Sequence, residues 1–334
     1  MAEIILSSGD RFDIQPGVSI LDAAGKSGVF MPYSCKSGRC STCKCKVLSG
    51  ETTVLQAEMG LTDGEKAEGW ILSCVRSASA DVVLESEDLG GIELPAVKTL
   101  PCRIGSLEKL APDVLRVVLR LPPTAVFDFL PGQYIDIIGA DGVRRSYSLA
   151  SAQAGSKTLE LHIRAVEGGA MSAYWFGQAK VNDLLRLNGP LGTFFLRRVA
   201  GLDLIFLATG TGIAPVKAIL ESIEGLAEEQ RPRSVTVLWG GRVAEDLYAD
   251  IAAIGARHRY VPVLSRADAG WTGSRGHVQD VLLSLEPDLD NAVVYACGSD
   301  AMIHGAQDRL VRAGLPANRF YSDAFVCSAP TSAN

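Results

Sequence analysis

The chain has 334 residues, a net charge of −6 and an apolar fraction of 47%, which is enough for two or three packed domains. The acidic balance argues against general nucleic-acid binding, which needs a basic surface. The first residues carry no signal-peptide pattern, and no apolar run approaches the roughly 20 residues that span a bilayer. We therefore expect a cytoplasmic protein with no nucleic-acid and no membrane partner, in which eight cysteines indicate metal or redox chemistry before disulfides.

The first part of the chain, residues 1–88, contains five of the eight cysteines and predicts a small α+β domain. Strand-like runs lie at 4–6, 11–14 and 82–84, and a helix is expected at about 19–27. Thr62 and Glu65 have the spacing of a capping box, which indicates a second short helix. A Gly- and Pro-bearing linker is expected at 89–97.

Residues 98–199 predict an antiparallel barrel, because apolar runs at 114–121, 133–138, 146–149 and 159–164 are separated by turn residues. Residues 200–334 are expected to alternate between strands and helices. Strands are expected at 204–208, 235–239, 260–264 and 293–296, and helices at 215–224, 245–254, 278–285 and 301–313. Such alternation predicts a parallel sheet covered by helices.

The cysteines of the first part follow the spacing Cys35-x4-Cys40-x2-Cys43, with Cys74 after thirty intervening residues. Four thiolates hold a [2Fe–2S] cluster, and this is the plant-type ferredoxin spacing. A structural zinc site usually has paired Cys-x2-Cys knuckles, and four buried thiols are the other alternative. Cys45 is expected to pack in a strand.

Arg145, Tyr147 and Ser148 predict a flavin site, because arginine pairs with a pyrophosphate, an aromatic ring packs on the flavin and a hydroxyl reaches its ring nitrogens. The tetrapeptide alone is a weak signal. Gly169 and Ser172 follow at an expected helix start and suggest an anion nest, with a plain turn as the alternative. His162 reads as a satisfied strand residue rather than a catalyst.

Residues 207–215 join an apolar strand to a helix through Gly210-Thr211-Gly212, which predicts a dinucleotide pyrophosphate at the helix start. The loop lacks the third glycine of the ordinary dehydrogenase fingerprint. Cys297 and Gly298 end the last long strand, where ligands of open α/β sheets bind. The alternative for Cys297 is a small buried apolar residue.

Further motifs are spread along the chain, and they read CKSGRCSTC, PGQYIDI, RRSYSLAS, HIRAVEGGAMS, GPLGTF, ATGTGIAP, YACGSDAMI and FYSDAF. On these motifs the whole chain resembles the ferredoxin–NADP reductase superfamily, in its form with an N-terminal plant-type ferredoxin domain. Within it the chain is most similar to CDP-6-deoxy-Δ3,4-glucoseen reductases, and also to reductase components of Rieske oxygenases. The implied fold class is multidomain α/β: a β-grasp [2Fe–2S] ferredoxin domain, an antiparallel β-barrel FAD domain and a parallel α/β nicotinamide-binding domain.

The resemblance assigns roles to matching positions. The implied metal ligands are Cys35, Cys40, Cys43 and Cys74. The positions expected near FAD are Arg145, Tyr147, Ser148, His162, Arg164, Gly169, Met171, Ser172 and Phe325. Those expected near the nicotinamide dinucleotide are Thr209, Gly210, Thr211, Gly212, Arg242, Cys297 and Gly298. The implied hydride site is lined by Ser148, Cys297 and Asp323.

The implied function is an NADH-dependent reductase that passes electrons from NADH through FAD to the [2Fe–2S] cluster and then to an acceptor enzyme, since flavin links two-electron and one-electron carriers. The expected acceptor is a CDP-hexulose dehydratase, and the alternative is a Rieske oxygenase component. NADH is expected over NADPH, because Arg242 is the only cation in residues 240–246, which also contain Glu245 and Asp246. A hypothesis of another class is a non-enzymatic ferredoxin-type carrier. Four cations crowd the cluster loop and suggest a docking patch for an acidic acceptor, with solvated surface as the alternative: Lys36, Arg39, Lys44 and Lys46.

Overall fold

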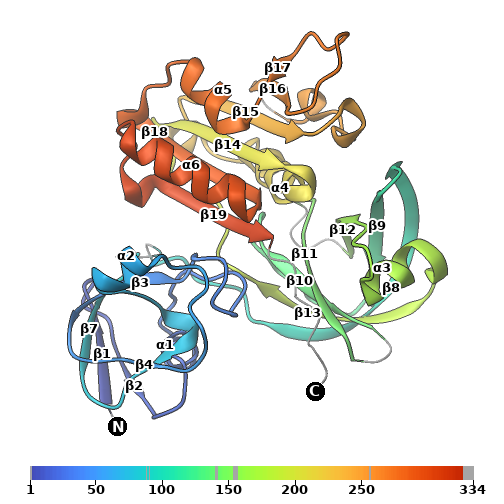
Figure 1. Cartoon of the computed structure of the whole chain (residues 1–334). Helices are drawn as coiled ribbons and strands as arrows, with labels where there is room; N and C mark the ends of the chain where they lie inside the picture. The colour runs from blue at the N-terminus through green and yellow to red at the C-terminus, as the bar shows by residue number, and fades with distance from the viewer. Residues whose placement is uncertain are drawn as a thin grey trace. The chain divides into compact units, whose positions relative to one another are not determined.

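The computed structural model describes residues 2–87, 89, 91–139, 142–152, 157–255 and 257–325. The chain divides into two compact units, Met1–Leu94 with Asp323–Asn334, and Pro95–Ser322. Figure 1 labels the helices and strands in chain order. None of the helices in the described ranges has the length and apolarity needed to cross a membrane.

The first unit is built on a five-stranded sheet with the order β2-β1-β7-β3-β5. Its elements are β1 (Ala2–Leu6), β2 (Arg11–Ile14), α1 (Ile20–Lys26), β3 (Lys44–Ser49), β4 (Thr53–Val54), α2 (Asp63–Ala67), β5 (Trp70–Leu72), β6 (Arg76–Ser77) and β7 (Val82–Glu85). The Ser19 hydroxyl accepts the Asp22 N–H and caps α1, and the predicted capping box of Thr62 and Glu65 is present at α2. Because α1 ends at Lys26 and β3 begins at Lys44, a long connection between them carries three of the predicted cluster ligands.

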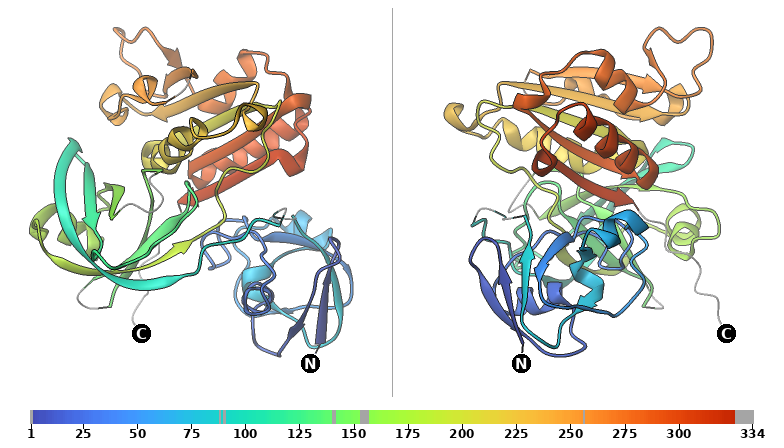
Figure 2. Two further views of the ribbon diagram at one scale, coloured as in Figure 1. Left: turned by 180° about the vertical axis from the view of Figure 1, so that it is seen from behind. Right: turned by 60° about the vertical axis from the view of Figure 1, so that its left-hand side comes forward.

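Pro95–Ser322 begins with a six-stranded antiparallel sheet of order β11-β10-β13-β8-β9-β12. Its strands are β8 (Lys98–Ala111), β9 (Val114–Arg120), β10 (Tyr134–Ile138), β11 (Arg144–Ser148), β12 (Thr158–Arg164) and β13 (Leu184–Leu191). The short helix α3 (Ala170–Ala173) lies between β12 and β13 in the chain. Register shifts interrupt the pairing of β8 with β9, and β8, drawn in teal, is strongly curved in the left view of Figure 2. An isolated bridge joins Leu149, next to β11, to Leu161 on β12, so the first and last strands of the sheet meet as the predicted barrel requires.

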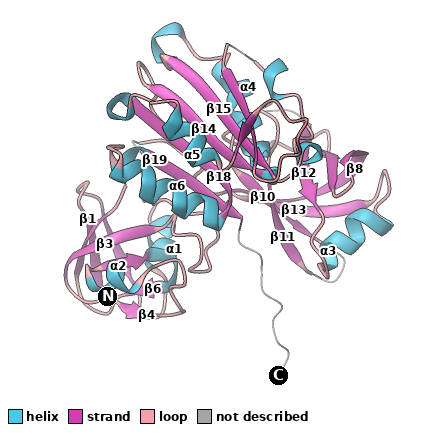
Figure 3. Ribbon diagram, turned by 45° about the horizontal axis from the view of Figure 1, so that its top comes forward, coloured by secondary structure: helices cyan, strands magenta, loops and turns pink. Residues whose placement is uncertain are grey.

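The last part of the chain forms a six-stranded sheet of order β17-β16-β15-β14-β18-β19. Its elements are β14 (Asp203–Thr209), α4 (Ile213–Ile223), β15 (Ser234–Gly241), β16 (Arg259–Leu264), β17 (Ser274–Arg275), α5 (Val278–Ser284), β18 (Ala292–Ser299), α6 (Asp300–Arg312) and β19 (Phe320–Phe325). Strand β14 pairs in parallel with both β15 and β18, as the alternation of strands and helices predicts. Figure 3 shows α4, α5 and α6 lying against these strands.

The structure corrects one expectation about secondary structure and contains strands that the sequence did not predict. The helix predicted at 245–254 is wrong, because this segment contains only the short 3-10 turns Ala244–Asp246 and Ile251–Ala253. Tyr248 explains the difference, since its ring packs edge-on against Trp239 and its hydroxyl bonds to His162. These contacts hold the segment in an irregular conformation instead of a helix. Strands β8 and β13 were not predicted. The domain boundaries 1–88, 89–97, 98–199 and 200–334 stay predictions, and Gly90 of the expected linker lies outside the described residues.

Candidate functional site

The four predicted ligands of the cluster meet as two close pairs. Cys43 Sγ and Cys74 Sγ lie 3.2 Å apart, with Cys74 placed by the turn that follows β5. Cys40 Sγ accepts the backbone N–H of Cys35 at 3.4 Å, and the two side chains are also hydrogen-bonded. The four cysteines that the spacing singles out thus form two close pairs in the structure, and their ligation of a cluster stays a prediction.

The backbone of residues 35–41 turns around these sulfurs. Lys36, Gly38 and Ser41 all have positive φ, at 53°, 72° and 60°. Glycine is required at position 38, because a Cβ there would lie 2.6 Å from the Ala57 carbonyl oxygen. The Ser37 N–H donates to Cys35 Sγ at 3.4 Å, so the folded loop points backbone donors at the sulfurs.

Within each pair the pKa of one thiol is lowered and that of its partner is raised. The hydrogen bond to Cys40 lowers the pKa of Cys35 to about 5, and the bond to Cys43 lowers the pKa of Cys74. The same bonds, together with burial, raise the pKa of Cys40 and of Cys43. Among the described residues no three His, Cys, Asp or Glu side chains surround a single ion position. Two thiol pairs instead fit a [2Fe–2S] cluster, which takes four thiolates over two irons.

The proposed docking cations near this loop are partly neutralised. They are Lys36, Arg39, Lys44 and Lys46. The Lys36 Nζ lies 3.3 Å from Asp22 Oδ1, and the Lys44 Nζ lies 2.9 Å from Glu65 Oε1. These two ion pairs lower the net positive charge of the patch.

The predicted flavin residues lie on β11. Arg145 and Tyr147 are half-buried, and Ser148 is buried where the strand ends. The Tyr147 hydroxyl accepts the Trp175 Nε1–H at 3.0 Å, and burial raises the pKa of Tyr147 to about 12, so the phenol stays neutral at pH 7. A guanidinium, a neutral phenol and a hydroxyl on one strand form a donor set that fits FAD.

The glycine pair precedes α3 as expected. Gly168 has φ +70° and open space around its Cα, and Gly169 is the N-cap of α3. Met171 is buried in the barrel core, and Ser172 Oγ accepts the Val166 N–H at 2.9 Å. Met171 and Ser172 therefore brace this turn from inside, and their contact with FAD stays a prediction.

His162 and Arg164 lie on β12 and face the nucleotide-binding part of the chain. His162 is buried, and both of its ring nitrogens have partners, Glu160 at 3.0 Å and Tyr248 at 3.1 Å. Arg164 pairs with Asp113 and Asp246, each at 3.2 Å. A Cβ on Gly210 would lie 3.1 Å from Arg164 Nη1, so this guanidinium sits beside the dinucleotide loop.

The two loops of the predicted nicotinamide site lie side by side at the ends of β14 and β18. A Cβ on Gly212 would lie 2.2 Å from the Cys297 carbonyl oxygen, so only glycine allows this approach. The Ser299 N–H donates to Thr209 Oγ1 at 3.0 Å, which ties the two loops together. Cys297 is fully buried at the end of β18, and Thr211 lies between the two glycines of the first loop.

Asp323, on β19, has a partner that the sequence did not indicate. Its carboxylate accepts the Ser34 hydroxyl at 2.6 Å, and burial raises the pKa of Asp323 to about 6. Ser34 directly precedes the cluster ligand Cys35. Phe325, expected to cover the flavin, is 36% exposed. The hydride-site role of Asp323 stays a prediction.

Three protein families match the chain in succession. Residues 4–79 match the 2Fe-2S iron-sulfur cluster binding domain, residues 101–196 the oxidoreductase FAD-binding domain, and residues 206–308 the oxidoreductase NAD-binding domain. The "CDP-6-deoxy-L-threo-D-glycero-4-hexulose-3-dehydrase reductase" of Yersinia pestis is 42% identical over 96% of this chain and 97% of its own length. The chain belongs to the ferredoxin–NADP reductase superfamily of iron–sulfur flavoprotein reductases.

Two further superfamily members illustrate the range of relatives. The "Terephthalate 1,2-dioxygenase, reductase component 2" of Comamonas sp is 32% identical, covering 96% of each chain. The crystal structure of the Amycolatopsis cytochrome P450 reductase GcoB has a TM-score of 0.74 and 30% identity, over 97% of this chain and 99% of that chain. Membership confirms the predicted fold class, the [2Fe–2S], FAD and nicotinamide modules, and an electron-transfer oxidoreductase activity. The hypothesis of a non-enzymatic carrier is not favoured.

Several residues that support these superfamily sites gave no signal in the sequence. Glu58 is buried in the ferredoxin-type unit, where its carboxylate accepts the Leu72 N–H at 2.8 Å and Arg76 Nη2 at 2.6 Å. Trp239 Nε1 donates to the Gly210 carbonyl at 2.9 Å and fixes the dinucleotide loop. Lys217, on α4, donates to the Ala150 carbonyl at 2.9 Å. Because most of their partners lie far away in the chain, no local sequence pattern predicts these contacts.

Proposed function

We propose that this reductase takes electrons from NADH and delivers them to a CDP-hexulose dehydratase in deoxysugar biosynthesis. The observation that carries the proposal is the 42% identity, over almost the full length of both chains, to a protein whose name states that role. An oxygenase component is the second candidate acceptor, supported by 32% identity to a terephthalate dioxygenase reductase component over 96% of each chain.

The residues of each site have separate tasks. Cys35, Cys40, Cys43 and Cys74 would hold the cluster, and Arg145, Tyr147 and Ser148 would hold FAD. When bound, FAD accepts a hydride's two electrons and the cluster passes them on one at a time. Gly212 and Gly298 allow the loops after β14 and β18 to approach each other closely, and the dinucleotide would bind at these strand ends. Cys297 would support the nicotinamide ring as a small polarisable side chain, without forming a covalent bond to it.

NADH is proposed over NADPH because of the loop that follows β15. Glu245 is exposed there, and Asp246 holds the loop by accepting the N–H of Arg242 at 2.7 Å. Two carboxylates beside Arg242 disfavour a 2′-phosphate. The test is the ratio of kcat/KM for the two cofactors with ferricyanide as acceptor. We expect NADH to be preferred at least tenfold, and a tenfold preference for NADPH contradicts the proposal.

The acceptor is tested by reconstitution. Purified reductase is mixed with NADH and either a CDP-hexulose dehydratase loaded with its substrate or a Rieske oxygenase component. We expect deoxysugar product with the first and little electron transfer to the second. The visible spectrum is recorded before and after NADH, and flavin and iron–sulfur bands that NADH bleaches establish the reductase independently of the partner. Bleaching without product formation contradicts only the choice of acceptor.

A further inference from the structure

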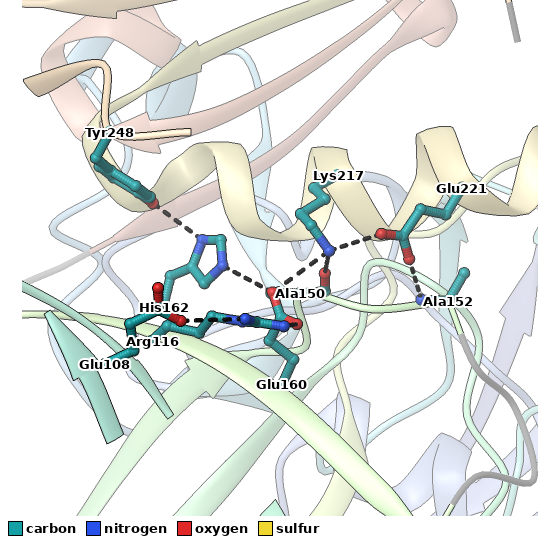
Figure 4. A network of polar contacts seen from close by, with 9 residues as sticks. All are labelled: Glu108, Arg116, Ala150, Ala152, Glu160, His162, Lys217, Glu221 and Tyr248. Carbon is teal, nitrogen blue, oxygen red and sulfur yellow. Dashed lines mark hydrogen bonds and ion pairs between the residues drawn. The ribbon is translucent and has the colours of Figure 1, made fainter. Parts of the chain in front are cut away.

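Helix α4 is bound to the flavin barrel by a pair of side chains that the dinucleotide motif does not include. Lys217 Nζ donates to the Ala150 carbonyl at 2.9 Å and to Glu221 Oε1 at 2.6 Å. The other Glu221 oxygen accepts the Ala152 N–H at 2.9 Å. Figure 4 shows Lys217 and Glu221 reaching from one face of the helix to this segment.

The same lysine meets a buried carboxylate of the barrel. Lys217 Nζ lies 3.3 Å from Glu160 Oε1 on β12. Glu160 is 9% exposed, and its other oxygen lies 3.0 Å from Arg116 Nη2. Arg116 also pairs with Glu108 at the barrel surface. The positive neighbours and the bond to His162 outweigh the effect of burial and lower the pKa of Glu160 to about 2, so the carboxylate is ionised at neutral pH.

A second arm joins β12 to the dinucleotide loop. His162 Nε2 lies 3.0 Å from Glu160 Oε1, and His162 Nδ1 lies 3.1 Å from the Tyr248 hydroxyl. The Tyr248 ring packs edge-on against Trp239 at 5.1 Å, and Trp239 holds the Gly210 carbonyl. The dinucleotide loop is thereby connected to β12 at two points. Trp239 holds its first residue, Gly210, and Lys217 holds the helix that follows it.

The positions of these contacts in the chain give them a role in the reaction. Lys217 lies in the second turn of α4, directly behind Gly210–Gly212. Ala150 follows Ser148, the end of the flavin strand, by two residues. A largely buried helix turn therefore links the predicted loop for the nicotinamide dinucleotide to the predicted strand for the flavin. Hydride transfer depends steeply on such alignment, because a misplacement of about 1 Å costs roughly 10²-fold in rate.

We propose that Lys217, clamped between Glu160 and the Ala150 carbonyl, is a positioning residue that aligns the nicotinamide with the flavin. It touches neither cofactor and acts through the placement of α4. The inference rests on the proposed NADH-to-FAD transfer. Burial of the clamp makes a methionine, of similar length and without charge, the variant that removes its polar contacts while keeping the packing of its stem.

The test is stopped-flow reduction of enzyme-bound FAD by NADH in wild type, Lys217→Met and Lys217→Arg. We expect Lys217→Met to lower the limiting reduction rate about tenfold, within the ~10²-fold that misalignment can cost, while the dissociation constant for NADH changes less than threefold. Lys217→Arg, which keeps a cation and its donors, is expected to recover at least half of the rate. Lys98→Met is the matched control, because Lys98 also donates to a carbonyl, that of Val126, but within the barrel alone.

A second readout does not depend on turnover. Hydrogen exchange of a peptide covering residues 149–152 is expected to be faster in Lys217→Met, because Glu221 loses the lysine that orients it toward the Ala152 N–H. Tyr248→Phe, which removes one hydroxyl and keeps the ring, is expected to slow reduction two- to threefold without altering exchange there. FAD content and reduction by dithionite are measured for every variant.

Three outcomes overturn the proposal. The first is a Lys217→Met enzyme with the wild-type reduction rate. The second is a loss of NADH affinity that accounts for the whole effect. The third is a lowered melting temperature as the sole change, which makes the clamp a matter of stability alone. A wild-type protein that NADH does not reduce contradicts the proposed function itself, and is distinguished from these outcomes without any variant.

Discussion

Removing the carboxylate of Glu58 tests how the ferredoxin-type unit holds its fourth cysteine. The Glu58 side chain is 3% exposed and that of its ion-pair partner Arg76 is 17% exposed. Glu58 also accepts the N–H of Leu72, two residues before Cys74. The Glu58 carboxylate thus binds the chain on both sides of Cys74, at Leu72 and at Arg76.

The expected cost follows from these contacts. Breaking a buried ion pair by removing one partner costs about 3–5 kcal/mol, and leaving a buried N–H unpaired costs about 1–3 kcal/mol. In the variant Arg76 remains partly exposed to solvent and keeps its hydrogen bond to the Thr52 carbonyl at 3.4 Å. The lower end of the range for a broken buried ion pair therefore applies. We expect Glu58→Ala to destabilise the unit by about 3 kcal/mol. Glu58→Gln, whose amide oxygen still accepts from Leu72, is expected to cost about 1.5 kcal/mol.

The assay is urea denaturation of the holoprotein, followed by the visible circular dichroism of the cluster. With a urea dependence of about 1–3 kcal/mol per M, a loss of about 3 kcal/mol moves the midpoint down by about 1–3 M. Glu65→Gln is the control, because the Glu65–Lys44 pair has side chains 30% and 25% exposed and such pairs contribute about 0–1 kcal/mol. If Glu58→Ala shifts the midpoint no more than Glu65→Gln, the reasoning about the buried pair is refuted.

Four further predictions concern electron flow and pH. Cys74→Ser is expected to lose the cluster and keep FAD, so that it reduces ferricyanide but no one-electron protein acceptor; normal iron and sulfide content would sink the ligand assignment. Cys297→Ala is expected to slow reduction of FAD by NADH in stopped flow at near-normal FAD content, and an unchanged rate would remove its role. Lys36→Glu with Arg39→Glu is expected to slow delivery to the acceptor at low salt, and the difference from wild type should vanish near 1 M, where the Debye length is about 3 Å; identical flat salt curves would reduce the patch to solvated surface. The pKa of Glu160 falls from its ordinary 4.5 to about 2 on folding, so the stabilisation by its ionised carboxylate is complete above pH 4.5 and is lost as the pH drops toward 2. Discounted for partial solvation, this stabilisation amounts to about 2 kcal/mol. The difference in urea midpoint between wild type and Glu160→Gln should therefore shrink from pH 6 to pH 3.

Sequence was most informative where chemistry demands fixed residue types at short spacing. Cys35, Cys40 and Cys43 lie on one loop, and their separations alone indicate a cluster that needs a fourth thiolate. The strand, glycine loop and helix around Gly210 are local in the same way, because apolar periodicity and glycine placement are properties of adjacent residues. Capping of α1 by Ser19 and of α2 by Thr62 belongs to the same class, since each cap bonds three residues away.

Sequence failed where the partner of a segment lies far along the chain. Strand β8 has Pro101, Gly105 and a mixed pattern of exposure, so its identity as a strand comes from pairing with β9 and β13 rather than from its own residues. The helix expected at 245–254 has helical spacing of apolar residues, but Tyr248 is held by Trp239 and His162. Tertiary contacts of this kind outweigh propensities of a few tenths of a kcal/mol per residue.

The composition and the motifs by themselves indicated the three modules and the electron-transfer chemistry of this protein, and they predict its four cluster ligands. Tertiary structure alone decided which side chains hold those modules in working geometry: Glu58 behind Cys74, and Lys217 between Glu160 and the Ala150 carbonyl. Lys217 and Glu160 are 57 positions apart in the numbering, and nothing in either neighbourhood encodes the other. A buried charge is stable only with a partner in space, and where that partner stands is a property of the folded chain.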